Sequence, residues 1–139
     1  MSSALKLSLT RRYRFSASHR LSRPDLSESE NLSLYGKCSN PYGHGHNYTV
    51  EVTLTGPVDS TTGMIANLGD LDPFVEREVV EAFDQKNLNE EVPEFRKTVP
   101  TTENVVQEIY RRLSKFPAAR LERVRVEETG KNSFSFSGD

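Results

Sequence analysis

Two stretches of alternating apolar and polar residues constrain the fold of this chain most strongly, because both carry histidine at one end. From residue 5 to 19 the odd positions are mostly apolar, the even ones polar, and the odd series ends at His19. From residue 44 to 54 the even positions start with His44 and His46 and continue as apolar residues. Side chains of a β-strand alternate between two faces. The pattern therefore predicts two strands whose histidines extend their apolar faces.

These three histidines are the only ones in the chain. If the two strands pair as an antiparallel hairpin across the loop 20–43, the end of the first lies beside the start of the second, and the three imidazoles converge. Three neutral imidazoles suit Zn²⁺ and leave a fourth position for water or substrate, as in catalytic zinc sites. The alternative is three unrelated polar residues near a loop. Their shared parity favours the metal site.

Length, charge and cysteine usage narrow the class of protein. A chain of 139 residues fits one domain, here 1–139. A net charge of -2 gives no electrostatic footprint for nucleic acid. No stretch approaches the ~18 consecutive apolar residues of a membrane helix, and the N-terminus lacks an apolar signal core. One cysteine cannot form an internal disulfide. We therefore expect a soluble cytoplasmic protein.

The middle of the chain shows two helical patterns. The first has Asp72-Pro73 in its first turn, where proline costs little. The second begins after Thr101-Thr102, with Thr102 able to cap it and Glu103 in the favourable first turn. The segment 87–100 between them has no regular period and is interpreted as a connection. The apolar faces consist of Leu71, Val75, Val79 and Phe83 in the first helix, and Val106, Ile109, Leu113 and Phe116 in the second.

Two more strands end the chain, turning near residues 130–132. The order ββααββ predicts an α+β domain: a four-stranded antiparallel sheet with two helices on one face. Its outer strands would be long and unpaired, which is a liability unless another subunit covers them. We therefore expect a homo-oligomer. The length of the loop 20–43 indicates a functional segment rather than a simple turn.

Glu128 lies on the inward parity of the third predicted strand, beside Val124 and Val126. An inward charge needs a partner. It is either part of an internal salt bridge, a residue at the sheet end, or a carboxylate that receives N–H donors from a ligand such as an aminopyrimidinone ring. Thr101 and Thr102, at a helix start, could add contacts to such a ligand.

Cys38 lies six residues before His44 and can reach the metal region. It could be a fourth zinc ligand that closes the site, a catalytic thiolate acting on a zinc-held substrate, or a buried inert thiol. Spacing alone does not choose among the three. Asp84 ends the first helix and is by default a surface residue. Its neighbour Gln85 has no titratable proton.

Several segments together carry a resemblance to a known family. They are Phe15-Ser16-Ala17-Ser18-His19-Arg20, Gly36-Lys37-Cys38, Gly43-His44-Gly45-His46-Asn47-Tyr48, Gly63-Met64, Lys86-Asn87-Leu88, Thr101-Thr102-Glu103-Asn104-Val105 and Glu128-Thr129. With these motifs the chain resembles the 6-pyruvoyltetrahydropterin synthases over nearly its whole length. Five residues separate Cys38 from His44. The similar 6-carboxytetrahydropterin synthases usually have three, so the spacing favours the biopterin branch.

The resemblance implies a fold, a site and a reaction. It implies the tunnelling fold, in which three subunits join their sheets into a barrel and two trimers stack into a hexamer, with the active site between subunits. Zn²⁺ is the implied cofactor. The implied substrate is 7,8-dihydroneopterin triphosphate, converted by a lyase to 6-pyruvoyl-tetrahydropterin and triphosphate in tetrahydrobiopterin biosynthesis. The implied roles are zinc binding by His19, His44 and His46, pterin anchoring by Glu128, Thr101, Thr102 and Glu103, and proton transfer by Cys38 and Asp84.

One position departs from the family pattern. The family normally has Asp-His where this chain has Asp84-Gln85. Glutamine keeps a hydrogen bond but cannot carry a proton near neutral pH. The chain is thus expected to be a synthase, slowed if the missing imidazole transfers a proton. The alternatives are a catalytically impaired pterin-binding relative, or an enzyme that cleaves the side chain to 6-carboxy- or 6-hydroxymethylpterin.

Overall fold

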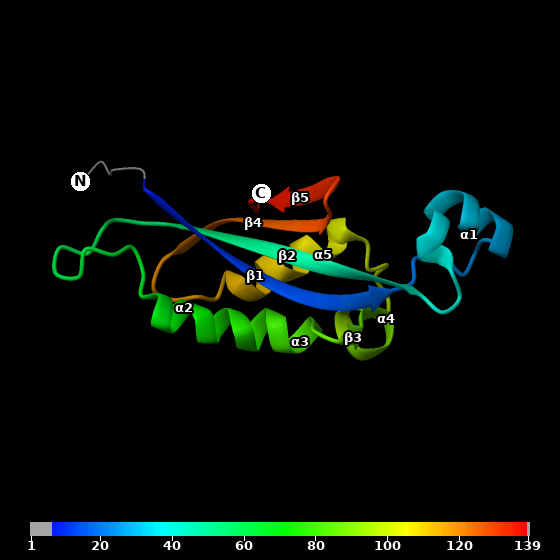
Figure 1. Cartoon of the computed structure of the whole chain (residues 1–139), viewed down its shortest axis with the longest axis horizontal. Helices are drawn as coiled ribbons and strands as arrows, with labels where there is room; N and C mark the ends of the chain where they lie inside the picture. Colours follow the sequence, from blue (N-terminus) through cyan, green and yellow to red (C-terminus); the bar gives the residue numbers. More distant parts are fainter. Residues whose placement is uncertain (1–6, 139) are drawn as a thin grey trace.

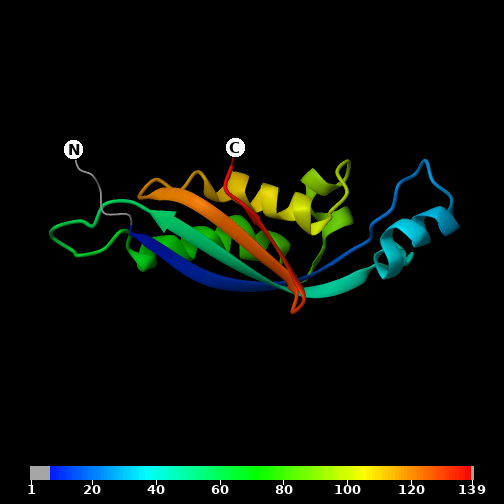
Figure 2. The same ribbon diagram turned by 90° about the horizontal axis from the view of Figure 1, so that it is seen from above.

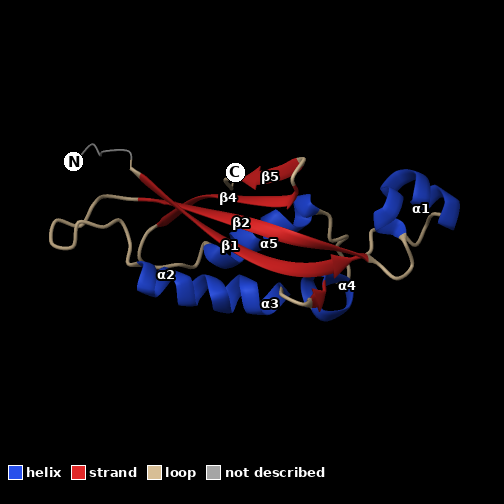
Figure 3. Ribbon diagram, viewed as in Figure 1, coloured by secondary structure: helices blue, strands red, loops and turns tan. Residues whose placement is uncertain are grey.

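A computed structural model describes residues 7–138 of the chain. One twisted five-stranded sheet carries the long helices on one of its faces (Figures 1 and 3). No helix within the described residues is both long and apolar enough to cross a membrane. The elements in chain order are β1 (Ser8–His19), α1 (Glu28–Tyr35), η1 (Gly36–Ser39), β2 (His44–Thr55), α2 (Leu68–Val75), η2 (Glu76–Val80), α3 (Glu81–Phe83), β3 (Lys86–Asn87), α4 (Leu88–Glu91), η3 (Pro93–Phe95), α5 (Thr102–Leu113), β4 (Arg120–Thr129) and β5 (Asn132–Phe136).

The strand order in the sheet is β3-β1-β2-β4-β5. The pairs β1–β2, β2–β4 and β4–β5 are antiparallel, which confirms the predicted four-stranded sheet. The structure adds β3, which pairs in parallel with β1 over two positions only, Ala17 with Lys86 and Ser18 with Asn87. The α+β class and the order of the long elements are therefore as predicted, with one short edge strand missed.

The core lies between the sheet and the layer formed by α2, η2, α3 and α5, which Figure 2 shows along one side of the sheet. The strand parity is correct where it matters for the site: Tyr13, Phe15, Ala17 and His19 of β1 are buried. Before the strand the pattern does not hold, since Leu7, the residue preceding β1, is 46% exposed. Residue 5, where the alternating pattern starts, lies outside the described residues. Both predicted helical faces are buried, at Leu71, Val75, Val79, Phe83, Val106, Ile109, Leu113 and Phe116.

Two helix boundaries differ from the predictions. The first helix begins at Leu68 with Asn67 as its cap, so Pro73 lies inside the helix rather than in its first turn. The π-helical turn η2 then follows, and the helix continues to Phe83. At the second helix Thr101, not Thr102, is the cap, because its hydroxyl accepts the N–H of Asn104. Thr102 is instead the first helical residue.

The segment 87–100 is not the irregular connection that the sequence predicted. It contains β3, α4 and η3, and it buries Leu88, Val92 and Phe95. Of these elements, α4 and η3 are single helical turns. Pro93 prevents α4 from continuing because proline has no backbone N–H. Short turns of this kind have too few residues to show a period.

The loop 20–43 holds a helix that the sequence analysis did not predict. Ser27 and Glu30 form a reciprocal capping box at the start of α1. The buried Asn31 side chain accepts from Arg23 N–H at 2.8 Å and donates to the Arg23 carbonyl at 3.1 Å. Figure 1 shows this segment projecting beyond the ends of β1 and β2. Its shape is thus fixed by polar contacts rather than by the core.

Candidate metal centre

The paired ends of β1 and β2 bring the histidines together. In the antiparallel register His19 lies opposite His44, and Ala17 lies opposite His46. Gly43 makes the approach to β2 possible: its φ of +82° is strained for an L side chain, and a Cβ there would lie 3.1 Å from the His19 carbonyl oxygen. The antiparallel pairing on which the predicted convergence depends is therefore present.

Cys38 lies beside the same strand end. The N–H of Leu21, two residues beyond His19, donates to the Cys38 carbonyl at 2.6 Å. Among the described residues, the side-chain donor atoms of His19, Cys38 and His46 all lie within 4.8 Å of one another. His44 is not part of this cluster, but its ring centroid is 4.5 Å from that of His46, at a near-perpendicular angle. Two of the three expected ligands and the thiol thus form one group of donor atoms.

The orientation of two imidazoles leaves their Nε2 atoms available to a cation. His19 Nδ1 lies 2.9 Å from the Pro100 carbonyl oxygen, which can only accept, so Nδ1 carries the proton. In the part of the chain that the structure describes, His19 Nε2 and His46 Nε2 are buried without a hydrogen-bond partner. Buried polar atoms normally have one. Two orphaned imidazole nitrogens beside a thiol are a donor set that fits Zn²⁺.

The pKa values favour the metal-binding form of both rings. Burial lowers the pKa of His19 and of His46, and it outweighs the opposing effect of the Glu128 carboxylate. Neutral imidazole is the form that binds metal. Glu128 Oε2 lies 3.4 Å from His46 Nε2 and 4.0 Å from His19 Nε2. Since the lowered pKa keeps both rings neutral, we describe this as a carboxylate close to uncharged imidazoles rather than as an ion pair.

Glu128 points inward, as its parity predicts, and its side chain is 14% exposed. Asn132 Nδ2 donates to its other oxygen at 3.3 Å. Burial raises the pKa of the Cys38 thiol, and the charge of Glu128 raises it further. In the metal-free chain Cys38 is therefore protonated at neutral pH. A nearby cation would instead lower the pKa of the Cys38 thiol.

The predicted pterin-binding residues flank the centre through Pro100. The His19–Pro100 contact places the start of α5 next to the metal cluster. Thr101 uses its hydroxyl as the helix cap, and Glu103 is exposed. Thr102 is 3% exposed, and its hydroxyl oxygen is the third buried side-chain atom in residues 7–138 without a hydrogen-bond partner.

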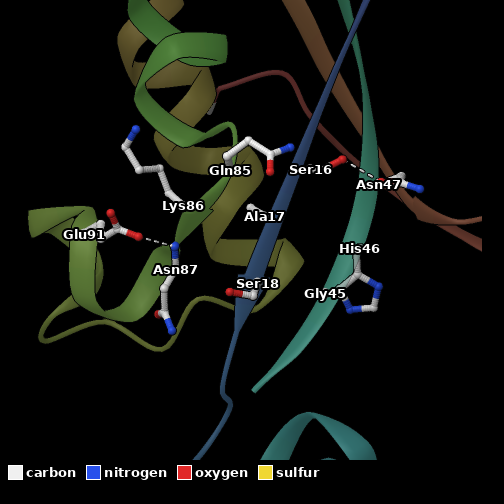
Figure 4. Close-up of a pocket in the computed structure, with 10 residues that line it drawn as sticks. All are labelled: Ser16, Ala17, Ser18, Gly45, His46, Asn47, Gln85, Lys86, Asn87 and Glu91. Atoms are coloured by element: carbon white, nitrogen blue, oxygen red, sulfur yellow. Dashed lines mark hydrogen bonds between the residues drawn. The ribbon is translucent and has the colours of Figure 1, made fainter. Parts of the chain in front are cut away.

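Asp84 and Gln85 are tied to the edge of β1 instead. An Asp84 carboxylate oxygen accepts the Ser16 N–H at 2.8 Å, and the Gln85 N–H donates to the Ser16 carbonyl at 2.6 Å. Gln85 adopts a left-handed φ of 59°. It lines a cavity of about 470 Å³ together with residues of β1, β2 and the segment 86–91 (Figure 4). In that view β1 runs between Gln85 and His46. The structure does not place Asp84 in the cluster with Cys38.

Sequence reasoning missed two residues that position the centre. One is Pro100, whose carbonyl orients His19; a backbone acceptor has no sequence signature. The other is Asn89, whose side chain accepts the Arg20 N–H at 2.7 Å and donates to the Arg20 carbonyl at 2.9 Å. These two bonds fix the backbone directly after His19. Finding Asn89 would have required recognising α4 as an ordered element.

The fold and the centre together define a class: a tunnelling-fold α+β protein with a buried, imidazole-rich centre that could hold a metal. Residues 8–139 match the family model described as 6-pyruvoyl tetrahydropterin synthase. The chain therefore belongs to this family of enzymes, as the sequence motifs predicted.

Individual relatives agree with this assignment. The human protein named 6-pyruvoyl tetrahydrobiopterin synthase is 48% identical over 132 residues, which cover 94% of this chain and 91% of the relative. The solved structure of Caenorhabditis elegans 6-pyruvoyl tetrahydropterin synthase superimposes with a TM-score of 0.92 at 38% identity, covering 100% of both chains. A protein of Archaeoglobus fulgidus named putative 6-carboxy-5,6,7,8-tetrahydropterin synthase is 35% identical over 74% of this chain and 81% of its own length.

Proposed function

We propose that the chain is a zinc-dependent lyase that converts 7,8-dihydroneopterin triphosphate to 6-pyruvoyl-tetrahydropterin and triphosphate. The observation that carries the zinc part is the pair of buried Nε2 atoms of His19 and His46 without a hydrogen-bond partner among the described residues. The identity to relatives named as this synthase supports the reaction. When bound, Zn²⁺ supplies a Lewis acid that makes C–H protons beside the coordinated side-chain hydroxyls easier to remove.

Two sets of three residues are candidates for the ligands of the ion. The family resemblance gives His19, His44 and His46, whereas the donor group in the structure has Cys38 in place of His44. The 4.5 Å separation between the His44 and His46 rings keeps His44 within reach of the centre after a side-chain rotation. We propose the three histidines as ligands, because this leaves Cys38 free to take and return protons at the substrate side chain.

Glu128 is the proposed anchor for the pterin ring. Its carboxylate lies 3.4 Å from the His46 ring, so a substrate held by it would place its side chain near the metal. Charge-assisted hydrogen bonds from the ring N–H groups would orient the substrate. The proposed binding segment also includes Thr101, Thr102 and Glu103. The Thr102 hydroxyl has no hydrogen-bond partner among the described residues and could form one with the substrate.

The active assembly is proposed to be a homohexamer, a dimer of trimers with sheets joined into a barrel. β3 covers β1 at only two positions, and β5 is the other edge of the sheet. The projecting segment carries exposed apolar side chains at Leu32 (60%), Leu34 (57%) and Tyr42 (96%). Edges and apolar surfaces of this kind are usually covered. Light scattering of the purified protein tests the assembly, and a monomeric mass contradicts it.

The decisive experiment is incubation of the zinc-loaded protein with 7,8-dihydroneopterin triphosphate, followed by mass spectrometry of the pterin product. Formation of 6-pyruvoyl-tetrahydropterin is the expected result. A 6-carboxy- or 6-hydroxymethylpterin product would instead show side-chain cleavage; of these two products, only the 6-carboxy one corresponds to the name of the Archaeoglobus relative. Binding of the pterin without turnover would show that the chain is an impaired member of the family.

A further inference from the structure

The turn in front of α5 is held by two hydrogen bonds to one oxygen. The Val99 carbonyl accepts the Thr101 N–H at 2.8 Å and the Asn104 side-chain amide, through Nδ2, also at 2.8 Å. Pro100, between Val99 and Thr101, is the centre of this tight three-residue turn. Its ring fixes φ near −65°, so the turn has little freedom once the Val99 oxygen is held.

This geometry determines where the Pro100 carbonyl points. The Pro100 C=O and the Thr101 N–H belong to one planar trans peptide unit, in which they point in opposite directions. Because the N–H end is bound to the Val99 oxygen, the C=O end is directed away from that oxygen. It meets His19 Nδ1 at 2.9 Å in a buried contact. Tyr48 provides a longer contact to the same nitrogen, at 3.4 Å, and cannot fix the ring as well.

We propose that Asn104 is a positioning residue for the metal centre. By holding the Val99 oxygen, it orients the Pro100 carbonyl, which keeps the His19 proton on Nδ1 and the lone pair on Nε2. Partners behind a metal ligand select its tautomer and orientation in this way. The proposal rests on the metal centre described under the proposed function. It connects that centre to the segment proposed to bind the pterin, because Asn104 lies in the same first helical turn as Thr102 and Glu103.

The substitution Asn104→Asp separates positioning from helix stability. The carboxylate keeps the size of the side chain but has no N–H to donate to the Val99 oxygen. At the same time, an acidic residue in the first turn is favourable for the helix. If Asn104 only stabilises the start of the helix, N104D should therefore bind Zn²⁺ as tightly as wild type. Positioning predicts weaker metal binding, even though an added negative charge would by itself attract a cation.

The measurement is Zn²⁺ affinity, by competition with a chromophoric chelator in the absence of substrate. We expect N104D to bind Zn²⁺ about 10- to 100-fold more weakly than wild type, with the metal-free protein still folded by circular dichroism. Gln107→Glu is the matched control: it makes the same amide-to-acid change one turn later, where the amide donates to the Glu103 carbonyl at 3.2 Å. Its affinity should equal that of wild type.

A second readout needs no metal. In the metal-free protein, ¹⁵N NMR of the His19 ring should show a single Nδ1–H tautomer in wild type and a mixture in N104D. Equal Zn²⁺ affinity and the same single tautomer in both proteins would overturn the proposal. If N104D does not fold, N104A provides the same comparison without a charge. A wild-type chain that binds no Zn²⁺ contradicts the metal centre itself, and the tautomer comparison then decides whether Asn104 positions His19.

Discussion

Leu88 allows a quantitative test of the segment between the helices, because its side chain is fully buried in a region that the sequence predicted to be a loop. It is the first residue of α4, and its exposed fraction is 0%. Changing Leu88 to Ala removes three carbon atoms from the core. At roughly 0.8 kcal/mol for each buried carbon group, the loss of transfer free energy alone is about 2.4 kcal/mol.

A cavity term adds to this value. If the neighbours relax only partly and leave about 50 Å³ empty, the cavity costs roughly another 1 kcal/mol at ~24 cal/mol per Å³. We therefore expect L88A to lower the free energy of unfolding by about 3.5 kcal/mol. Leu7→Ala is the control: this side chain lies just before β1 and is 46% exposed, so the change should stay within about 0.5 kcal/mol.

The assay is urea unfolding followed by far-ultraviolet circular dichroism, since the chain has no tryptophan to report by fluorescence. All variants are compared metal-free and at one protein concentration, because metal binding and oligomerisation shift the midpoint. A loss below about 1 kcal/mol in L88A, or equal losses in both variants, would refute the placement of Leu88 in the core. The segment 87–100 would then be the simple connection expected from its sequence.

Three further predictions concern the site and the sheet. Cys38→Ala should abolish turnover and leave the zinc content intact; loss of zinc on metal analysis would make Cys38 a ligand. Gln85→His should raise turnover by about 10²- to 10⁴-fold if the absent imidazole transfers a proton, and an unchanged rate would show that it is dispensable. The Asp72 carboxylate accepts bonds from Arg11 and Tyr13, and the Arg11 hydrogen bond is the main cause that lowers its pKa. A lowered pKa stabilises the fold above the ordinary aspartate value and loses this effect as pH falls. The stability difference between wild type and Asp72→Asn should thus close below about pH 4, measured by urea midpoints.

The hairpin that carries the histidines could be predicted because its information is local. Alternation along β1 and β2 assigns a face to every side chain, and antiparallel pairing then puts His19 opposite His44. Glu128 could be placed inward by the same argument. These predictions required no knowledge of distant contacts, since the strands are long enough for the period to be read.

Other parts of the centre could not be predicted, because they depend on backbone atoms and tertiary contacts. Nothing in the residue pattern shows that the Pro100 carbonyl accepts a hydrogen bond from His19 or that the Asn89 side chain bonds to the backbone of Arg20. Similarly, α4 buries Leu88 through contacts made only after the chain has folded. The proximity of Cys38 to the histidines could be predicted from its position six residues before His44. Its place in the donor group with His19 and His46, where His44 was expected, depends on how the loop 20–43 returns to β2.

The backbone at position 85 determines how an added imidazole can be interpreted. Gln85 is the only residue other than glycine with a positive φ in residues 7–138, and its N–H is held by the Ser16 carbonyl. Histidine is one of the residue types enriched in this left-handed region, together with Asn and Asp. The substitution Gln85→His therefore requires no change in the turn between Phe83 and β3. Any gain or lack of gain in turnover can then be assigned to the chemistry of the side chain rather than to an altered fold.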